Sequence, residues 1–218
     1  MDLVEYLGTK KLNELIIENP YNSAGVLDIA AGKHNQRGLG FLGQRFRLSE
    51  KQGLKQSNTT VGTIYNCVVQ MVRIQPDFAT VALTDIIVGR PLFWNDKKKF
   101  LVTPLAATTA QLAGISLVTL TSANAKGDII PIVVAGDVGV KMSATITKAS
   151  PVVNDPVVMA VASNLGVADI LADATAWTNV QLGVYMGKLI EALGTGGDGE
   201  VHKMNLTGAI QVLNDGVM

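Results

Sequence analysis

The sequence predicts a mainly β protein: small β-barrel or sandwich modules, one or two in number, preceded by an extended N-terminal arm that contains a short helix. Three observations lead to this fold class. Runs such as residues 61–72 and 129–134 are rich in the residue types that favour strands. Turn-forming pairs such as Gly127-Asp128 separate these runs at short intervals. The 22 glycines and the hydrophobic share of 48% fit short strands around a buried core.

Residues 1–60 are expected to form the arm, because charge is concentrated there and small apolar residues dominate the chain afterwards. Within the arm, Leu12, Leu15 and Ile16 recur at helical spacing. We therefore predict one short helix, from about Lys10 to Glu18.

A basic segment lies near the end of the arm. Residues 33–55 include six lysines or arginines and one acidic residue, a local charge of +5, although the whole chain has 18 basic and 18 acidic residues. Such a segment can dock on an acidic protein surface, and with few aromatic side chains it is not expected to bind nucleic acid. The residues expected to contact a partner are Arg37, Phe41, Arg45, Phe46, Arg47, Lys51 and Lys55. The alternative is a solvated loop without a partner.

Short strands and turns are expected after residue 60. Strands are predicted over 61–72, 79–88 and 129–134. Turns are predicted where Gly, Asn, Asp or Pro gather, at 76–77, 89–91, 95–96, 127–128, 136–137 and 154–156. Residues 160–176 are rich in alanine, which favours a helix, but they also contain valine, threonine and asparagine, which do not. A short helix is predicted there.

An internal correspondence divides the β region into two modules. Residues 114–117 resemble 183–186, residues 127–129 resemble 199–201, and residues 135–140 resemble 207–212. Each copy is expected to contain a strand, a turn that begins with glycine and an acidic residue, a second strand, and a glycine kink into a third strand. We predict a first β-module at 61–145 and a second, degenerate repeat at 146–218. The alternative is chance similarity among common residues.

Little in the sequence could hold a metal, a cofactor or a disulfide, and none of these is expected. Cys67 is the only cysteine, and its apolar neighbours predict a core thiol. His34 and His202 are too far apart for any common zinc spacing. Gly38 to Gly43 spells GxGxxG, but no strand precedes it and no acidic ribose partner follows, so we interpret it as a flexible loop. The apolar runs are too short to span a membrane, and no membrane partner is expected.

The chain is expected not to be an enzyme. A serine or cysteine nucleophile needs a base, and neither histidine stands in a pattern that would supply one. Acidic residues stand beside glycines, where carboxylates usually serve turns, so no glycosidase pair is selected. A carbohydrate-binding or hydrolytic β domain is an alternative. Against it, Trp94 and Trp177 are the only tryptophans, and both are expected to be packed rather than to offer a sugar platform.

The region from Thr80 to Met142 contains short motifs in a recognisable order. They are Val88-Gly89-Arg90-Pro91-Leu92-Phe93-Trp94-Asn95, the lysine-rich turn Asp96 to Lys99, Phe100-Leu101-Val102, Ala113-Gly114-Ile115-Ser116-Leu117, and Ala125-Lys126-Gly127-Asp128 with the apolar run that ends at Gly136. This order resembles that of capsid cement, or head decoration, proteins of tailed bacteriophages, over less than a third of the chain. One departure is Gly89-Arg90, because many family members have Gly-Asp at this position.

The resemblance implies a small β-barrel-like module that binds assembled capsid shells between major capsid proteins, often as a trimer and without enzymatic activity. It also implies contacts made by an N-terminal segment. The expected function is therefore that of a virion structural protein, made in the host cytoplasm and placed on the capsid exterior, with the major capsid protein as its partner. A tail-tube or baseplate subunit is the first alternative.

Overall fold

The structure, a computed structural model, is mainly β, which confirms the predicted fold class. It describes residues 12, 15–19, 41–50, 52–53, 64–75, 81–105, 111–124, 126–144, 146, 148–162, 165–170, 185–193 and 199–206. The elements are β1 (Arg45–Arg47), β2 (Tyr65–Ile74), η2 (Leu83–Asp85), β3 (Pro91–Asp96), η3 (Lys97–Lys99), β4 (Leu101–Thr103), β5 (Leu112–Ser116), β6 (Ile129–Lys141), β7 (Pro156–Ala162), β8 (Leu165–Ile170), β9 (Tyr185–Leu189) and β10 (Val201–Leu206). Here η marks a short 3₁₀ turn.

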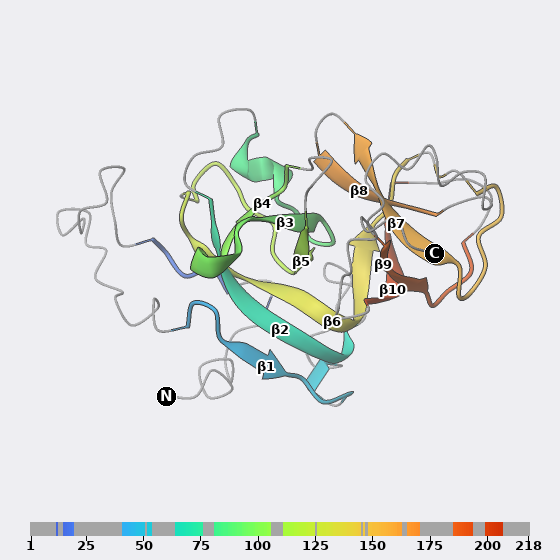
Figure 1. Ribbon diagram of the computed structural model, residues 1–218, viewed down its shortest axis with the longest axis horizontal. Helices are drawn as coiled ribbons and strands as arrows, with labels where there is room; N and C mark the ends of the chain where they lie inside the picture. Colours follow the sequence, from blue (N-terminus) through green and yellow to red (C-terminus); the bar gives the residue numbers. More distant parts are fainter. Residues whose placement is uncertain are drawn as a thin grey trace.

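Five strands close into a barrel. Going round it, β2 is followed by β4, β3, β5 and β6, and β6 pairs again with β2 (Figure 1). The β2–β4 pair is parallel, and the other four pairs are antiparallel. The two longest strands, β2 and β6, hold the barrel together, because they are rich in β-branched residues that pack well on a pleated surface.

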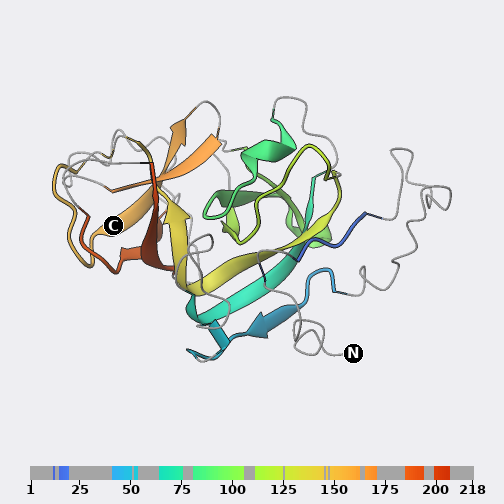
Figure 2. The same ribbon diagram turned by 180° about the vertical axis from the view of Figure 1, so that it is seen from behind.

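A second ring of strands begins at the C-terminal half of β6. Residues 136–141 of β6 pair with β10, which is followed by β9, β7 and β8. The chain directly after β6 closes this ring, because Met142 forms a parallel bridge with Ala168 of β8 and the Ser143 amide donates to the Ala168 carbonyl at 2.8 Å. Figures 1 and 2 show the two rings side by side, with β6 running from one to the other.

The two rings have the same topology. When β2, β3, β4, β5 and β6 are matched in turn with β6, β7, β8, β9 and β10, every pair of neighbours and every relative strand direction agrees. The first predicted repeat unit covers β5–β6, and the described part of the second covers β9–β10, whereas residues 183–184 and 207–212 lie outside the described part. Duplication of an ancestral module stays a prediction. β6 serves both rings, so the two modules share a strand. The expected boundary after residue 145 assigns all of β6 to the first module and therefore does not include this sharing.

Gly136 lies where β6 passes from the first ring to the second. Its φ of 95° is in the left-handed region, which glycine adopts far more readily than other residues. A Cβ at this position would lie 2.5 Å from the Asn66 carbonyl oxygen and 2.6 Å from the Cα of Cys67. Glycine therefore provides both the kink and the close approach to β2 that allow one strand to serve two rings.

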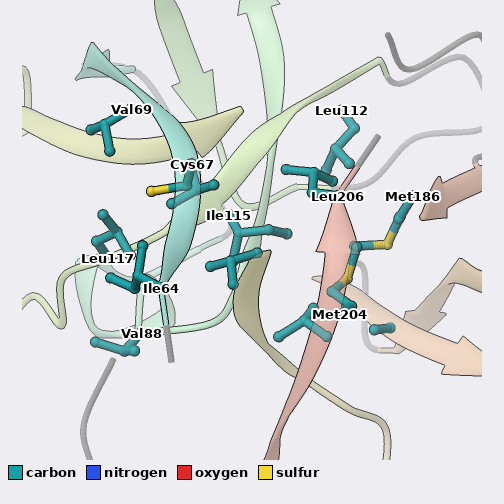
Figure 3. Packing of buried hydrophobic residues seen from close by; sticks show 14 of the residues in the cluster. Ile64, Cys67, Val69, Val88, Leu112, Ile115, Leu117, Met186, Met204 and Leu206 are labelled. Atoms are coloured by element: carbon teal, nitrogen blue, oxygen red, sulfur yellow. The ribbon is translucent and has the colours of Figure 1, made fainter. Parts of the chain in front are cut away.

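The buried apolar side chains form two clusters. One cluster draws on all five strands of the barrel, with members that include Val72, Leu92, Val102, Ala113 and Ile130. The other cluster, called here the shared core, extends from the barrel into the second ring. Figure 3 shows it, with Ile64, Cys67, Val69, Leu112 and Ile115 in the same cluster as Met186, Met204 and Leu206. The two rings are therefore stabilised by one continuous apolar interior.

Cys67 is a buried core thiol, as its neighbours predict. It is fully buried in the shared core, and this burial raises its pKa from 9.0 to about 12. Because thiolate is the reactive form, we expect an aromatic disulfide reagent to label Cys67 only after the chain unfolds. Rapid labelling of the native protein at neutral pH would contradict this expectation.

The raised pKa of Cys67 also predicts a dependence of stability on pH. The unfolded thiol loses its proton near pH 9.0, whereas the folded thiol keeps it up to about pH 12. The stabilisation is therefore complete below pH 9 and is lost as the pH rises through that interval. Urea unfolding below and above pH 9 should show a larger loss for the wild type than for Cys67→Ala, and equal losses would show that the prediction is wrong.

The predicted N-terminal helix is wrong over its described C-terminal part. Residues 15–19 are not helical, and Ile17 forms an antiparallel bridge with Ile129 at the start of β6. The Asn19 amide also donates to the buried carboxylate of Asp128 at 2.7 Å. Pairing with the barrel therefore overrides the local helical spacing. Of the remaining residues of that prediction, Leu12 is described, and residues 10–11 and 13–14 lie outside the described part.

Three further local predictions are corrected. Residues 160–162 and 165–170 form β7 and β8 rather than a helix, because pairing within the second ring outweighs the helical preference of alanine; residues 171–176 lie outside the described part. Within the predicted strand at 79–88, the described residues 81–88 contain η2 instead. The expected turn at 136–137 is a kink within continuous β6.

Part of the expected arm belongs to the sheet. β1 pairs with β2 in antiparallel register, with Phe46 opposite Val69. Leu48 is buried in the shared core, and its amide donates to the Cys67 carbonyl at 2.8 Å. Residues 41–50 are therefore held against the barrel rather than extended away from it, and most of residues 1–40 lies outside the described part.

Candidate interaction surface

β1 presents two arginine side chains to solvent. Successive side chains of a strand point to opposite faces, and Arg45 and Arg47 are exposed whereas Phe46 between them is half-buried. Phe46 packs against the shared core, which fixes the face that the arginines occupy. The sequence pattern Arg-Phe-Arg therefore places two cations side by side on one exposed face.

Gln70 on β2 anchors this part of the surface. Its side chain is 2% exposed, and it stands opposite Arg45 in the register. The Arg45 Nε donates to Gln70 Oε1 at 3.1 Å, and Gln70 Nε2 donates to the Gly43 carbonyl at 3.3 Å. A buried amide is stable only when its polar atoms have partners, so these two bonds hold β1 and its preceding loop in place.

A turn of three lysines follows β3. Lys97, Lys98 and Lys99 form η3, and all three are exposed. The carboxylate of Asp96 accepts from the amides of Lys98 at 3.0 Å and Lys99 at 3.2 Å, which caps the turn. Its other oxygen lies 3.6 Å from Lys99 Nζ, but that lysine side chain is 76% exposed, so the ion pair contributes little and leaves the cation accessible.

The arginine strand and the lysine turn meet through Phe100 and Gly43. Phe100 ends η3 with a φ of 55°, and its ring packs against Trp94 in an edge-to-face contact with centroids 6.5 Å apart. A Cβ at Gly43 would lie 2.4 Å from Phe100 Cε2, so the ring lies directly against the glycine. Figure 1 shows η3 and the loop before β1 beside one another at the same end of the barrel.

We call the exposed cations on these two segments the basic surface: Arg45, Arg47, Lys97, Lys98 and Lys99. Arg45 is held by Gln70, and the lysine turn is capped by Asp96, so the backbone beneath the cations is well ordered by hydrogen bonds. Such an arrangement can attract an acidic surface and fix its orientation.

The structure describes four of the seven residues predicted to contact a partner. Arg45 and Arg47 are exposed and fit that role. Phe41 and Phe46 are half-buried and pack against the shared core, which attaches β1 and its preceding loop to this chain, and their expected contact with apolar clefts in a partner stays a prediction. Arg37, Lys51 and Lys55 lie outside the described residues.

The lysines of η3 were not among the residues predicted for contact, although three consecutive lysines after an aspartate are visible in the sequence. Their link to Arg45 depends on the contact between Phe100 and Gly43, which are 57 positions apart in the chain. Neither residue carries a charge or a motif that predicts this contact. Only the closure of the barrel brings the two segments together.

Other candidate polar groups are accounted for by local contacts. His202 lies on β10, where its Nδ1 is 3.2 Å from Glu191 Oε1 and its side chain is 19% exposed, so it is less solvated than a simple surface position. Trp94 is half-buried against the barrel cluster, and Trp177 lies outside the described residues.

Within the described part of the chain, no group of three or more His, Cys, Asp or Glu side chains could hold a metal ion. Likewise, no helix there has the length and apolarity to cross a membrane.

No family model matches the chain, and no curated protein matches it. The basic surface is therefore interpreted from its own residues.

Proposed function

We propose that this chain is a non-enzymatic structural protein of a bacteriophage virion, which binds the exterior of the assembled capsid and reinforces it by bridging major capsid proteins. The motifs that resemble cement proteins lie between Thr80 and Met142, and this region supplies β3 to β6, four of the five barrel strands. The proposal thus joins the resemblance to a compact module that can present a contact surface.

The observation that carries the proposal is the basic surface. Five exposed cations on hydrogen-bonded backbone provide a site that attracts carboxylates, while the rest of the chain brings the net charge to zero. Single exposed ion pairs contribute little, about 0–1 kcal/mol each. A cement protein meets its partner many times on a symmetric shell or through its own trimer, so weak contacts can combine into strong retention.

In this proposal the chain strengthens the shell as a rigid body that bridges neighbouring subunits, without forming or breaking covalent bonds. Two rings that share β6 and one apolar core form a body that resists deformation. Such a body can carry load between neighbouring shell subunits when its basic surface rests on one of them. A trimer is the arrangement we favour, because three copies around a local axis would bridge several capsid proteins at once.

The test is co-sedimentation of the purified chain with empty mature shells built from the major capsid protein of the same genome. We expect the Arg45→Glu/Arg47→Glu double variant to bind at least about tenfold more weakly, because carboxylates would then face an acidic shell surface. Wild-type binding should also weaken as salt increases. Lys188→Glu on β9 is the matched control, since it reverses an exposed charge on the second ring, and it should bind as the wild type does.

Two outcomes would contradict the proposal. Binding by the double variant that equals wild-type binding would remove the basic surface from the contact. Absence of wild-type binding, with rings or tubes formed by the purified chain in negative-stain images, would support the tail-tube or baseplate alternative instead.

A further inference from the structure

β1 has one hydrogen-bonded edge and one open edge. Among the described strands it stands at the end of the ten-strand order and pairs with β2 alone. The Leu48 amide donates to the Cys67 carbonyl, and the Met71 amide donates to the Gln44 carbonyl at 3.1 Å. Backbone groups of an antiparallel strand alternate in direction, so residues 44, 46 and 48 face β2. The backbone groups of Arg45 and Arg47 therefore point to the open edge.

This open edge is available for another strand. Both arginines are exposed, and within the described part of the chain the recorded contacts of Arg45 and Arg47 are those to β2 alone, including the bond from Arg45 Nε to Gln70. Gln70, Gly43 and Leu48 hold the strand in its extended shape. A partner segment would meet an edge that is already ordered, so less conformational entropy is lost on binding.

The charge on β1 selects between possible partners. In a symmetric antiparallel pair of two copies of β1, Arg45 of one copy would stand opposite Arg47 of the other, and like charges directly opposite are destabilising. Charged residues on an edge strand are a known means of preventing such self-pairing. A segment with carboxylates at alternate positions would instead place opposite charges across from both arginines.

We propose that the open edge of β1 binds an extended acidic segment of a partner protein, which adds a strand beside β1 and pairs its alternate carboxylates with Arg45 and Arg47. The backbone hydrogen bonds of the added strand would supply affinity, and the alternate carboxylates would supply specificity. This inference rests on the proposed function only in that the shell protein would supply the segment. The lysines of η3 lie at the same end of the barrel and extend the positive field along the approach.

The experiment uses the full chain and a short capped peptide of alternating glutamate and valine. We expect the peptide to shift the backbone amide signals of Arg45 and Arg47 in NMR spectra and to slow the hydrogen exchange of these two amides, with smaller effects at the lysine turn. A peptide with lysine in place of glutamate should bind at least about tenfold more weakly. Equal binding of the two peptides, or shifts confined to Lys97–Lys99, would overturn the proposal.

Removing the outward hydrogen bonds tests the strand addition separately from charge. Methylation of the peptide amides that face β1 should abolish protection of Arg45 and Arg47, whereas methylation of the alternate amides should leave it intact. Arg47→Pro removes both an outward donor and the arginine charge, so it is compared with Arg47→Gln, which removes the charge alone, and it should bind the peptide more weakly than Arg47→Gln does; proline is tolerated on an edge strand when its missing donor faces away from the sheet. Undiminished binding after either change would overturn the inference.

The outcomes separate this inference from the proposed function. Shell binding without peptide binding would remove the edge-strand mode and leave the cement function standing. Peptide binding without shell binding would support the edge-strand mode and contradict the cement function. The partner would then be another protein with an acidic extended segment.

Discussion

Gly136→Ala is expected to lower the free energy of unfolding by more than about 2 kcal/mol, which is the upper cost of the left-handed conformation alone for an alanine. The backbone there has a φ of 95°. The added Cβ would in addition lie 2.5 Å from the Asn66 carbonyl oxygen, so β2 would have to move away from β6. Because β6 belongs to both rings, this movement would disturb the whole described fold rather than one loop.

Gly199→Ala is the matched control. Gly199 also has a positive φ, of 71°, but the nearest atom to an added Cβ would be the Cβ of Ala144 at 3.7 Å, an ordinary contact distance. This variant should therefore lose only the conformational cost of about 1–2 kcal/mol. Urea unfolding followed by circular dichroism measures both changes. Equal losses for the two variants would show that the close approach of Gly136 to Asn66 and Cys67 adds nothing to the cost of the Gly136→Ala substitution.

Phe93→Ala should be the most destabilising change among the core side chains, with an expected loss of about 3–5 kcal/mol. Phe93 lies on β3 and is fully buried in the shared core. Its ring also reaches the second ring of strands, because a Cβ at Gly166 of β8 would lie 2.4 Å from Phe93 Cε2. The truncation would therefore leave a cavity between the two rings as well as removing contacts within the barrel.

A double-mutant cycle with Gly166→Ala tests this contact directly. Alone, Gly166→Ala should be destabilising, since its methyl group would meet the Phe93 ring and Met159 Sδ, the latter at 3.1 Å. In the Phe93→Ala background the cavity can accept the methyl group, so the second change should cost less. The free energies come from urea unfolding of the four proteins. Additive losses would show that Phe93 does not pack between the rings in the way described.

The shared strand and the open edge assign different tasks to different parts of the chain. β6 and the shared core join two similar rings into one body. β1 lies at the margin of that body, where a few exposed residues can change without loss of core packing. Stability variants such as Phe93→Ala and contact variants such as Arg47→Glu should accordingly separate in experiment. The first group should alter unfolding, and the second should alter binding at unchanged stability.

Local sequence patterns were sufficient for several features. The β-branched run at 129–134 is the first half of β6, and the strand predicted at 61–72 overlaps β2. The buried state of Cys67 followed from its apolar neighbours. These features depend on residues close together in the chain, whose preferences agree with their final environment.

Other features were decided by partners far away in the chain. Residues 160–162 and 165–170 combine alanine with valine, and their pairing in β7 and β8 determines the strand state. Residues 15–19 are not helical, because the Ile17 amide donates to the Ile129 carbonyl and the Ile129 amide to the Ile17 carbonyl, both at 2.9 Å. In each case a tertiary hydrogen bond outweighs a weak local preference for helix.

A β-rich chain with turns at glycine and asparagine, a buried thiol, and cations grouped before the first long strand could all be predicted from the sequence, because composition and short spacing govern these properties. The folded arrangement alone established that β6 serves two rings of the same topology and that Gly136 allows it to do so. It also decided that the lysine turn lies beside Gly43 and that the backbone of Arg45 and Arg47 faces an open edge. The physical reason is that strand register and ring closure are set by contacts between distant residues, which no local pattern specifies.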